Sequence, residues 1–172
     1  MGDVYIEHLV KKRPDIKALL MKAVIIGAFG LVAGVFIMLA FAMTPLFLVL
    51  VLVLAFAAMH AMSYFNVEYE YLFTNGEIDI DIIYSKSRRK NLFSGEIKSF
   101  EIMCHATETA HNNLFSNADT KKDFTSGEIN ENTYKFYVNQ KGKRFAVLIE
   151  PSDELLKAFR LYLNTSKLIL KK

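Results

Sequence analysis

The side chains best suited to chemistry in this chain lie in one short segment, Cys104, His105, Glu108 and His111. Cysteine, histidine and glutamate can all bind zinc, but this spacing matches no standard zinc signature. On a helix, each step of three residues rotates by ~300°, so the side chains of His105, Glu108 and His111 would drift around the axis instead of converging. In a strand, Cys104 and His105 point to opposite sides, which leaves the thiol without a base. The segment therefore favours a buried structural thiol, and we predict no catalytic residue, metal site or cofactor.

The rest of the sequence adds no catalytic signature. It contains no glycine-rich phosphate loop, hydrolase elbow or kinase motif. The formal net charge of the 172 residues is only +3, which gives no reason to expect nucleic-acid binding, because that binding depends on phosphate neutralisation. We therefore predict a protein that is not an enzyme and does not bind nucleic acid.

A long apolar run precedes the part of the chain that must position these side chains. Residues 23–65 contain no Asp, Glu, Lys or Arg. A single helix of that length would reach roughly 64 Å, about twice the ~30 Å hydrocarbon core of a bilayer. Thr44-Pro45 divides the run into residues 23–43 and 46–64, each close to the length of one membrane crossing. The sequence predicts a two-helix transmembrane hairpin, with the lipid bilayer as its first partner.

This run divides the chain into a cytoplasmic or interfacial segment, 1–22, the hairpin, 23–65, and a cytoplasmic domain, 66–172. Basic residues flank the hairpin before its start and beyond its end: Lys11, Lys12, Arg13, Lys17 and Lys22, then Lys86, Arg88, Arg89 and Lys90. Positive charge marks cytoplasmic flanks, so we expect a multi-pass protein of the cell membrane with both termini in the cytoplasm. A signal peptide cleaved after the Ala40-Phe41-Ala42 tripeptide is the alternative, although its apolar region would be unusually long.

Small residues in the first predicted span indicate helix packing. Gly27, Gly30 and Gly34 fall on one helical face, and glycines there let two backbones approach closely. Two uses remain open. The glycines could pack the first span against the second, or they could join two copies of the chain as a homodimer.

The segment before the hairpin has the pattern of a short interfacial helix. Ile6, Leu9 and Val10 would share one face of that helix, with charged residues elsewhere, and Pro14 would end it. We therefore expect a helix at the membrane surface in this region.

The domain after the hairpin begins with a β-hairpin signal. Asn75-Gly76 separates two strand-like runs, 67–74 and 77–84, and this dipeptide is typical of a type I′ turn. A two-residue turn places the apolar side chains of both runs on one face of the sheet. These pairs are Phe73 with Ile78, Tyr71 with Ile80, and Tyr69 with Ile82.

The opposite face of this hairpin carries like charges. Glu70 would lie directly opposite Asp81, an unfavourable pair unless a cation relieves it. The basic run 86–90 can supply that cation if it forms the third strand, and this explanation is preferred to a metal site. The same run is the candidate interaction surface: Lys86, Arg88, Arg89 and Lys90.

A second half completes the domain. Residues 100–105 form a predicted strand, and a second hairpin turns at Lys141-Gly142. Between them, the polar stretch 106–132 reads as a loop that is either mobile or functional. A final amphipathic helix starts after the cap residue Ser152 and runs to about Asn164.

These hairpins, the basic third strand, the turn around Ile97 and the C-terminal helix resemble the bacterial pleckstrin-homology-like (PH-like) domains that follow a two-span hairpin. Over residues 20–165 the chain also resembles short membrane proteins of Firmicutes. The resemblance implies a membrane α-hairpin plus an α+β domain, an antiparallel PH-like sheet or open barrel closed by the C-terminal helix. Eukaryotic relatives bind phosphoinositides through a basic first loop. Here Asn75-Gly76-Glu77 lacks that cluster, so headgroup recognition is not expected.

The sequence leaves two functions open. The first is a membrane-anchored, non-enzymatic binding or scaffold module at the cytoplasmic face of a bacterial membrane. Its partner would be another membrane or membrane-proximal protein. The second is a small accessory subunit of a transporter or envelope assembly that docks through its transmembrane hairpin.

Overall fold

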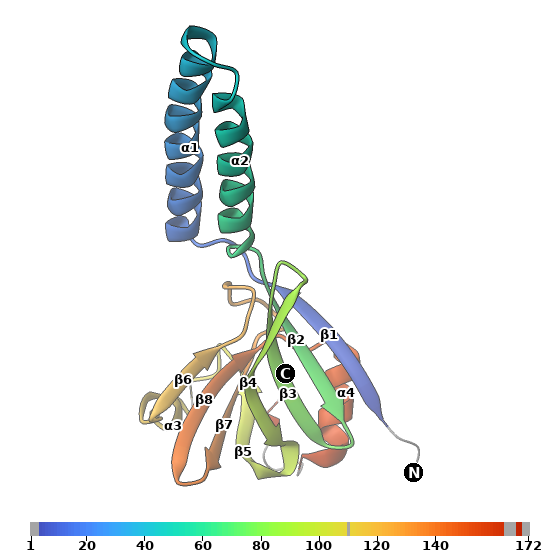
Figure 1. The fold of residues 1–172 in the computed structure, drawn as a ribbon. Helices are drawn as coiled ribbons and strands as arrows, with labels where there is room; N and C mark the ends of the chain where they lie inside the picture. The colour runs from blue at the N-terminus through green and yellow to red at the C-terminus, as the bar shows by residue number, and fades with distance from the viewer. Residues whose placement is uncertain (1–3, 110, 164–167, 170–172) are drawn as a thin grey trace. The chain divides into compact units, whose positions relative to one another are not determined.

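The computed structural model describes residues 4–109, 111–163 and 168–169. The chain forms two compact units (Figure 1). Residues 1–13 and 68–172 make up one unit, and residues 14–67 make up the other. The helical unit is therefore inserted between the first and second strands of the β-rich unit.

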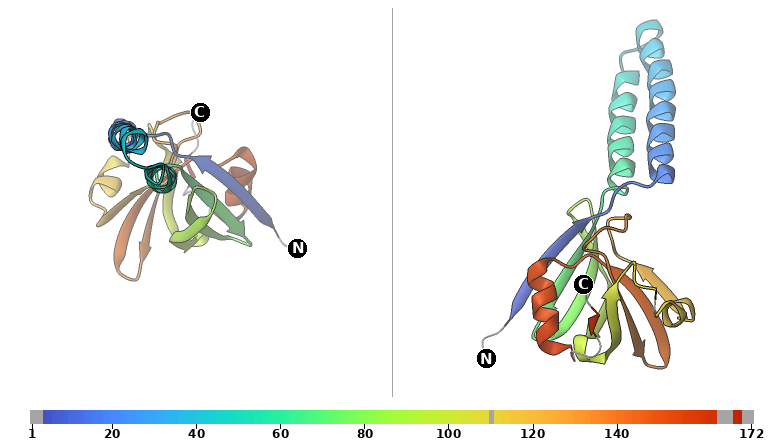
Figure 2. Two further views of the ribbon diagram at one scale, coloured as in Figure 1. Left: turned by 45° about the horizontal axis from the view of Figure 1, so that its top comes forward. Right: turned by 180° about the vertical axis from the view of Figure 1, so that it is seen from behind.

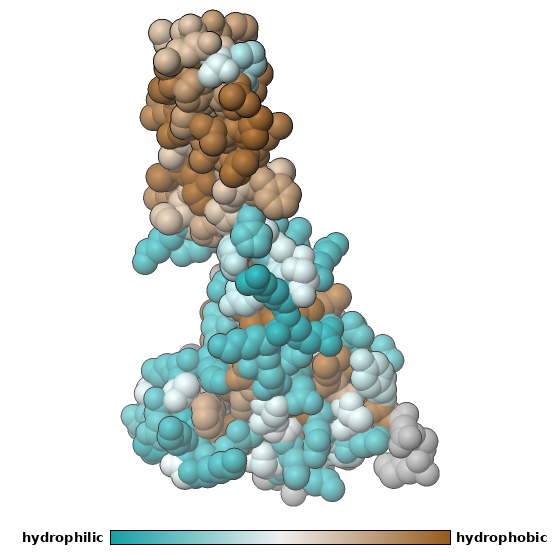
Figure 3. Space-filling model, in the orientation of Figure 1, coloured by the Kyte–Doolittle hydropathy of each residue, from teal (hydrophilic) through white to brown (hydrophobic). Residues whose placement is uncertain are grey.

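The helical unit consists of α1 (Ile16–Ala42) and α2 (Phe47–Ser63). The Asp15 carboxylate accepts a hydrogen bond from the Ile16 N–H at 2.7 Å, so α1 begins earlier than residue 23. The two helices expose large apolar side chains along their length, as the brown surface in Figure 3 shows. By length and composition α1 could cross a membrane, whereas α2, with 17 residues, is a shorter apolar helix.

The first sheet of the β-rich unit, sheet A, contains β1 (Tyr5–Lys11), β2 (Val67–Thr74), β3 (Glu77–Tyr84) and β4 (Arg88–Glu96), in that order. The turn between β2 and β3 has Asn75 at φ 50° and Gly76 at φ 96°, as the type I′ prediction requires. The apolar face expected for this hairpin is confirmed, because the six side chains are buried: Tyr69, Tyr71, Phe73, Ile78, Ile80 and Ile82.

The predicted interfacial helix before the hairpin is wrong, because these residues form β1. This strand pairs antiparallel with β2, with Ile6 opposite Phe73 and Lys11 opposite Glu68. Figures 1 and 2 show β1 and β2 side by side from opposite directions. Ile6 and Val10 point into the core, whereas Leu9 is 50% exposed, which is the alternation of a strand.

The second sheet, sheet B, has the order β6-β8-β7-β5-β9. Its strands are β5 (Phe100–His105), β6 (Thr120–Asp123), β7 (Tyr134–Gln140), β8 (Lys143–Ile149) and β9 (Leu168–Ile169). β5 follows the 3-10 turn η1 (Ile97–Ser99), and the short helix α3 (Asn112–Ser116) precedes β6. The predicted β7–β8 register is confirmed: Val138 pairs with Phe145, Phe136 with Val147 and Tyr134 with Ile149.

Across the described residues, the two sheets are mostly antiparallel and do not close into a barrel, which is consistent with the expected PH-like fold. A buried tyrosine links them. The Tyr71 hydroxyl on β2 donates to the Phe124 carbonyl at 2.7 Å and accepts from the Glu150 N–H at 3.1 Å. A lysine forms a second link, since Lys122 on β6 donates to the carbonyl of Leu92, which a register shift leaves without a partner residue in β3.

The last helix, α4 (Asp153–Tyr162), begins where the sequence predicts. The Ser152 hydroxyl accepts a hydrogen bond from the Leu155 N–H at 3.2 Å. The Phe159 and Tyr162 rings lie 5.6 and 5.5 Å from the Phe73 ring of β2, so α4 packs its apolar face against sheet A.

Candidate functional site

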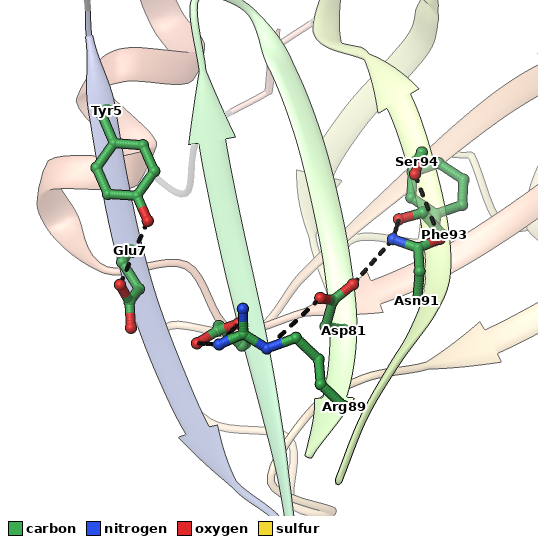
Figure 4. A network of polar contacts seen from close by, with 8 residues as sticks. Tyr5, Glu7, Asp81, Arg89, Asn91, Phe93 and Ser94 are labelled. Carbon is green, nitrogen blue, oxygen red and sulfur yellow. Dashed lines mark hydrogen bonds and ion pairs between the residues drawn. The ribbon is translucent and has the colours of Figure 1, made fainter. Parts of the chain in front are cut away.

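The basic run leads into β4, which pairs with β3, and the Arg89 side chain of β4 lies across the acidic face of sheet A, as the sequence predicts (Figure 4). The Arg89 guanidinium on β4 pairs with the Glu70 carboxylate on β2 at 2.7 Å, and its Nε lies 3.8 Å from Asp81 Oδ2 on β3. Asn91 adds a hydrogen bond of 2.9 Å to the Asp81 carboxylate. One arginine and one amide therefore relieve the like-charge pair, which confirms the electrostatic explanation.

The two ion-pair partners at the centre of this network differ in their exposure to solvent. The Glu70 side chain is 2% exposed, whereas that of Arg89 is 55% exposed. Burial raises the pKa of Glu70 because it penalises the carboxylate, and the Arg89 charge partly opposes this shift. Arg89 thus covers a carboxylate that the sheet has removed from water, while the outer part of its side chain faces solvent.

The remaining residues of the candidate interaction surface lie at and beside the turn between β3 and β4. Lys86, Arg88 and Lys90 are exposed, and Lys86 adopts φ 58° in the turn. β4 lies at the edge of sheet A. The structure therefore places three exposed cations beside an arginine held in the acidic network, on a strand edge. Their role in partner binding stays a prediction.

The side chains of Cys104 and His105 are held inside the β-rich unit by packing and hydrogen bonds. Cys104 is fully buried, and burial raises the pKa of its thiol. The imidazole of His105 contacts the Thr107 hydroxyl at 2.7 Å through Nδ1 and the Glu131 carbonyl at 3.0 Å through Nε2. Within the described part of the chain, no group of three or more Cys, His, Asp or Glu side chains could hold a metal ion.

The polar stretch 106–132 is not one continuous loop, since it contains α3 and β6. Its later part is fixed to distant residues. Ser126 donates to the Glu150 carboxylate at 2.8 Å through its hydroxyl, and its carbonyl accepts from the Arg13 N–H at 2.8 Å. The Arg13 side chain also pairs with Glu128. From the sequence alone, Arg13 is expected only to flank the hairpin as a positive charge, because its partners Ser126 and Glu128 are distant in the sequence.

The three glycines of α1 line no contact with α2. A Cβ added at Gly27, Gly30 or Gly34 would meet no atom within 4 Å. The contact between the helices instead involves Phe36 and Phe47, whose ring centroids are 6.1 Å apart. This open space favours packing against another chain, and the use of the glycines stays a prediction.

Comparison with known proteins gives one family. The model of the family described as Bacterial PH-like domain (DUF6106) matches residues 2–168. No curated protein and no solved structure matches the chain. The family match extends over β1, both helices and both sheets, so the helical unit lies within the region that defines the family.

Proposed function

The chain belongs to the bacterial PH-like domain family, and on that premise we propose that it is a membrane-anchored, non-enzymatic binding or scaffold module. In this proposal α1 and α2 both cross the bacterial cell membrane, and the β-rich unit acts at the cytoplasmic face. PH-like domains are typically binding modules, which supports a role in binding rather than in catalysis. The C-terminal helix α4 would close one end of the domain.

One observation carries the membrane part of the proposal. β1 precedes α1 and β2 follows α2, yet the two strands pair along their length, with Lys11 opposite Glu68. Segments that pair in one sheet lie on the same side of a membrane. The chain between them must therefore cross an even number of times. Since α1 is long and apolar enough for one crossing, α2 is the element available for the return.

The length of α2 is compatible with that role. Its 17 residues span roughly 25 Å, at the short end of the ~17–25 residues used by transmembrane helices. The basic residues near both ends of the hairpin, Arg13 and Lys17 before and Lys86 after, favour the cytoplasm for the β-rich unit.

The binding surface in this proposal is the exposed part of the β3–β4 turn and of β4. Lys86, Arg88 and Lys90 present positive charge, and Arg89 is held in the acidic network beside them. The expected partner is a membrane or membrane-proximal protein with an acidic surface. Anchoring both proteins to one membrane raises their effective concentration without adding contacts.

A specific observation favours a second candidate function. Gly27, Gly30 and Gly34 lie on one face of α1 and face open space in the monomer. In the alternative, the chain is an accessory subunit of a transporter or envelope assembly, and this face docks on a transmembrane helix of the partner. The same face would also serve a homodimer.

Crosslinking in intact cells distinguishes the two functions. Under the first, Lys86→Glu/Arg88→Glu abolishes most crosslinks formed by the full-length protein, because it reverses the charge of the surface. Lys141→Glu, at the other hairpin turn, is the matched control and should change little. Under the second, Gly30→Leu/Gly34→Leu removes the crosslinks instead, since the side chains block close helix approach. Partners retained by both double variants contradict both proposals.

A further inference from the structure

A groove of about 260 Å³ lies on the face of sheet B that α3 covers. We call it the α3 groove. α3 lies beside β6 and β8 in Figure 1. The volume falls just below the ~300–1,000 Å³ of ordinary ligand pockets, which suits a small molecule. Residues of α3, β6, β7 and β8 line the groove, among them Phe115, Lys135, Ala146 and Leu148.

The walls of the α3 groove are mainly apolar. Ala146 and Leu148 alternate with the half-buried Phe145 and the core residue Val147 along β8, so their side chains lie on the α3 side of the sheet. Phe115 of α3 lines the groove above them. The small side chain of Ala146 leaves room beneath the helix. This surface can accept the apolar part of a ligand.

One wall carries a buried ammonium group. Lys135 on β7 is 6% exposed, although lysine is seldom fully buried without a charged partner. Its Nζ donates to the Glu108 carbonyl and, at 2.7 Å, to Asn112 Oδ1, and it lies 4.8 Å from the centroid of the Phe115 ring. These contacts are to neutral groups.

The structure shows no direct ion-pair partner for Lys135 among the described residues. An ammonium has three N–H donors, and the described residues accept hydrogen bonds from it at two atoms. Burying a charge without a counterion is costly, so an anion in the groove would gain a strong, partly desolvated contact.

The other charged residues of the lining limit the charge of that anion. The Lys122 ammonium donates to the Leu92 carbonyl, so it is already engaged. The Asp123 carboxylate accepts from the N–H and the hydroxyl of Thr125, at 2.9 and 2.7 Å. Its negative charge disfavours a multiply charged ligand, whereas a monoanion needs only Lys135 as its partner. Lys121 is exposed and adds long-range attraction.

We propose that the α3 groove binds a small organic carboxylate. The carboxylate pairs with the Lys135 ammonium, and the apolar body of the ligand packs on Phe115, Ala146 and Leu148. This site lies wholly within the β-rich unit, and it requires neither the membrane topology nor the partner surface proposed above. It would make the domain responsive to a small metabolite in addition to a protein partner.

The test uses the full-length protein in lipid nanodiscs, labelled with ¹³C at alanine and leucine methyl groups. Hexanoate is the probe, and hexanamide is the matched neutral molecule. Hexanoate should give saturable shifts of the Ala146 and Leu148 methyl signals, whereas the Ala158 methyl in α4 should not move. Hexanamide should bind at least about tenfold more weakly, because it cannot form the charge-assisted contact. Equal responses to the two molecules would overturn the proposal.

Two variants separate the charge from the cavity. Lys135→Met should weaken hexanoate binding about tenfold or more while the Ala158 signal keeps its position. Ala146→Leu fills the groove without removing the ammonium, so it should abolish the shift of Leu148 and remains decisive if the first variant does not fold. Unchanged hexanoate binding in Ala146→Leu contradicts the site. Displacement of hexanoate by inorganic phosphate, but not by hexanamide, would indicate a simple anion site and overturn the carboxylate assignment.

Discussion

At the scale of single residues, the sequence predicted a charge conflict and its solution but not the residue that provides it. Strand alternation placed Glu70 and Asp81 on one face, and the run 86–90 supplied several cations. Which cation reaches them depends on the β3–β4 register, in which Arg89 pairs with Ile83. That register includes a shift near Leu92, which no turn signal in the sequence encodes.

The burial of Lys135 likewise could not be predicted from the sequence. Its position between Tyr134 and Phe136 indicates that it lies on the face of β7 away from the core. The sequence does not indicate that α3 covers this face, because only five residues form that helix. Burial of the ammonium is thus a product of tertiary packing.

The raised pKa of Glu70 predicts a pH-dependent effect of Glu70→Gln. Because the folded state favours the protonated acid, the carboxylate lowers the free energy of unfolding above its raised pKa and has no such effect below the usual value of 4.5. Glu70→Gln should therefore stabilise the protein modestly at pH 7, with a difference that disappears as the pH falls below that value. Denaturant unfolding of the full-length chain measures this difference.

Glu77→Gln, at an exposed position of β3, is the matched control and should change the free energy of unfolding at pH 7 by no more than about 0.5 kcal/mol. If Glu70→Gln instead destabilises the protein at pH 7, the ion pair with Arg89 outweighs the cost of burial.

At the scale of elements, turn dipeptides and a helix-capping residue correctly predicted two hairpins and the start of the last helix. Asn75-Gly76 and Lys141-Gly142 each form the expected hairpin, and Ser152 caps the expected helix. The segment that forms β1 was misjudged because seven residues can satisfy both a helical and a strand pattern. Its partner β2 is separated from it by the whole helical unit. A long-range pairing of this kind overrides local propensity.

Two substitutions in β1 test its assignment. Val10 is 6% exposed and Leu9 is 50% exposed, although both lie on one face of the rejected helix. Val10→Asp should lower the free energy of unfolding by about 2–4 kcal/mol, because it buries a charge in the core of sheet A. Leu9→Asp should cost no more than about 1 kcal/mol. Hydrogen exchange of the β2 amides measures both, and similar losses in the two variants would contradict the strand.

At the scale of the whole molecule, the order of elements carries more information than any motif. The sequence indicated a hairpin followed by a domain, whereas β1 makes the domain begin before the hairpin. The predicted segment boundaries at residues 22 and 65 therefore reflect only the apolar run. The two connections between the units each tie a helix to a strand of the same sheet.

The proposed topology predicts a labelling pattern for cysteines in intact cells. Thr44→Cys, in the turn between α1 and α2, should react with a membrane-impermeant maleimide. Ser87→Cys, in the exposed β3–β4 turn, should react only after the cells are broken. The native Cys104 is buried and serves as the internal control. Reaction of Ser87→Cys in intact cells would reverse the orientation, and protection of both sites until lysis would contradict two crossings.

The insertion of α1 and α2 between β1 and β2 also sets the order in which the protein can mature. During synthesis β1 leaves the ribosome first, but its pairing partner β2 is made only after both helices. If α1 and α2 both cross the membrane as proposed, sheet A cannot assemble until α2 has brought the chain back to the compartment of β1. In the proposed topology, a helix pair inserted with one crossing would leave β1 and β2 in different compartments, so formation of sheet A would act as a checkpoint on membrane integration.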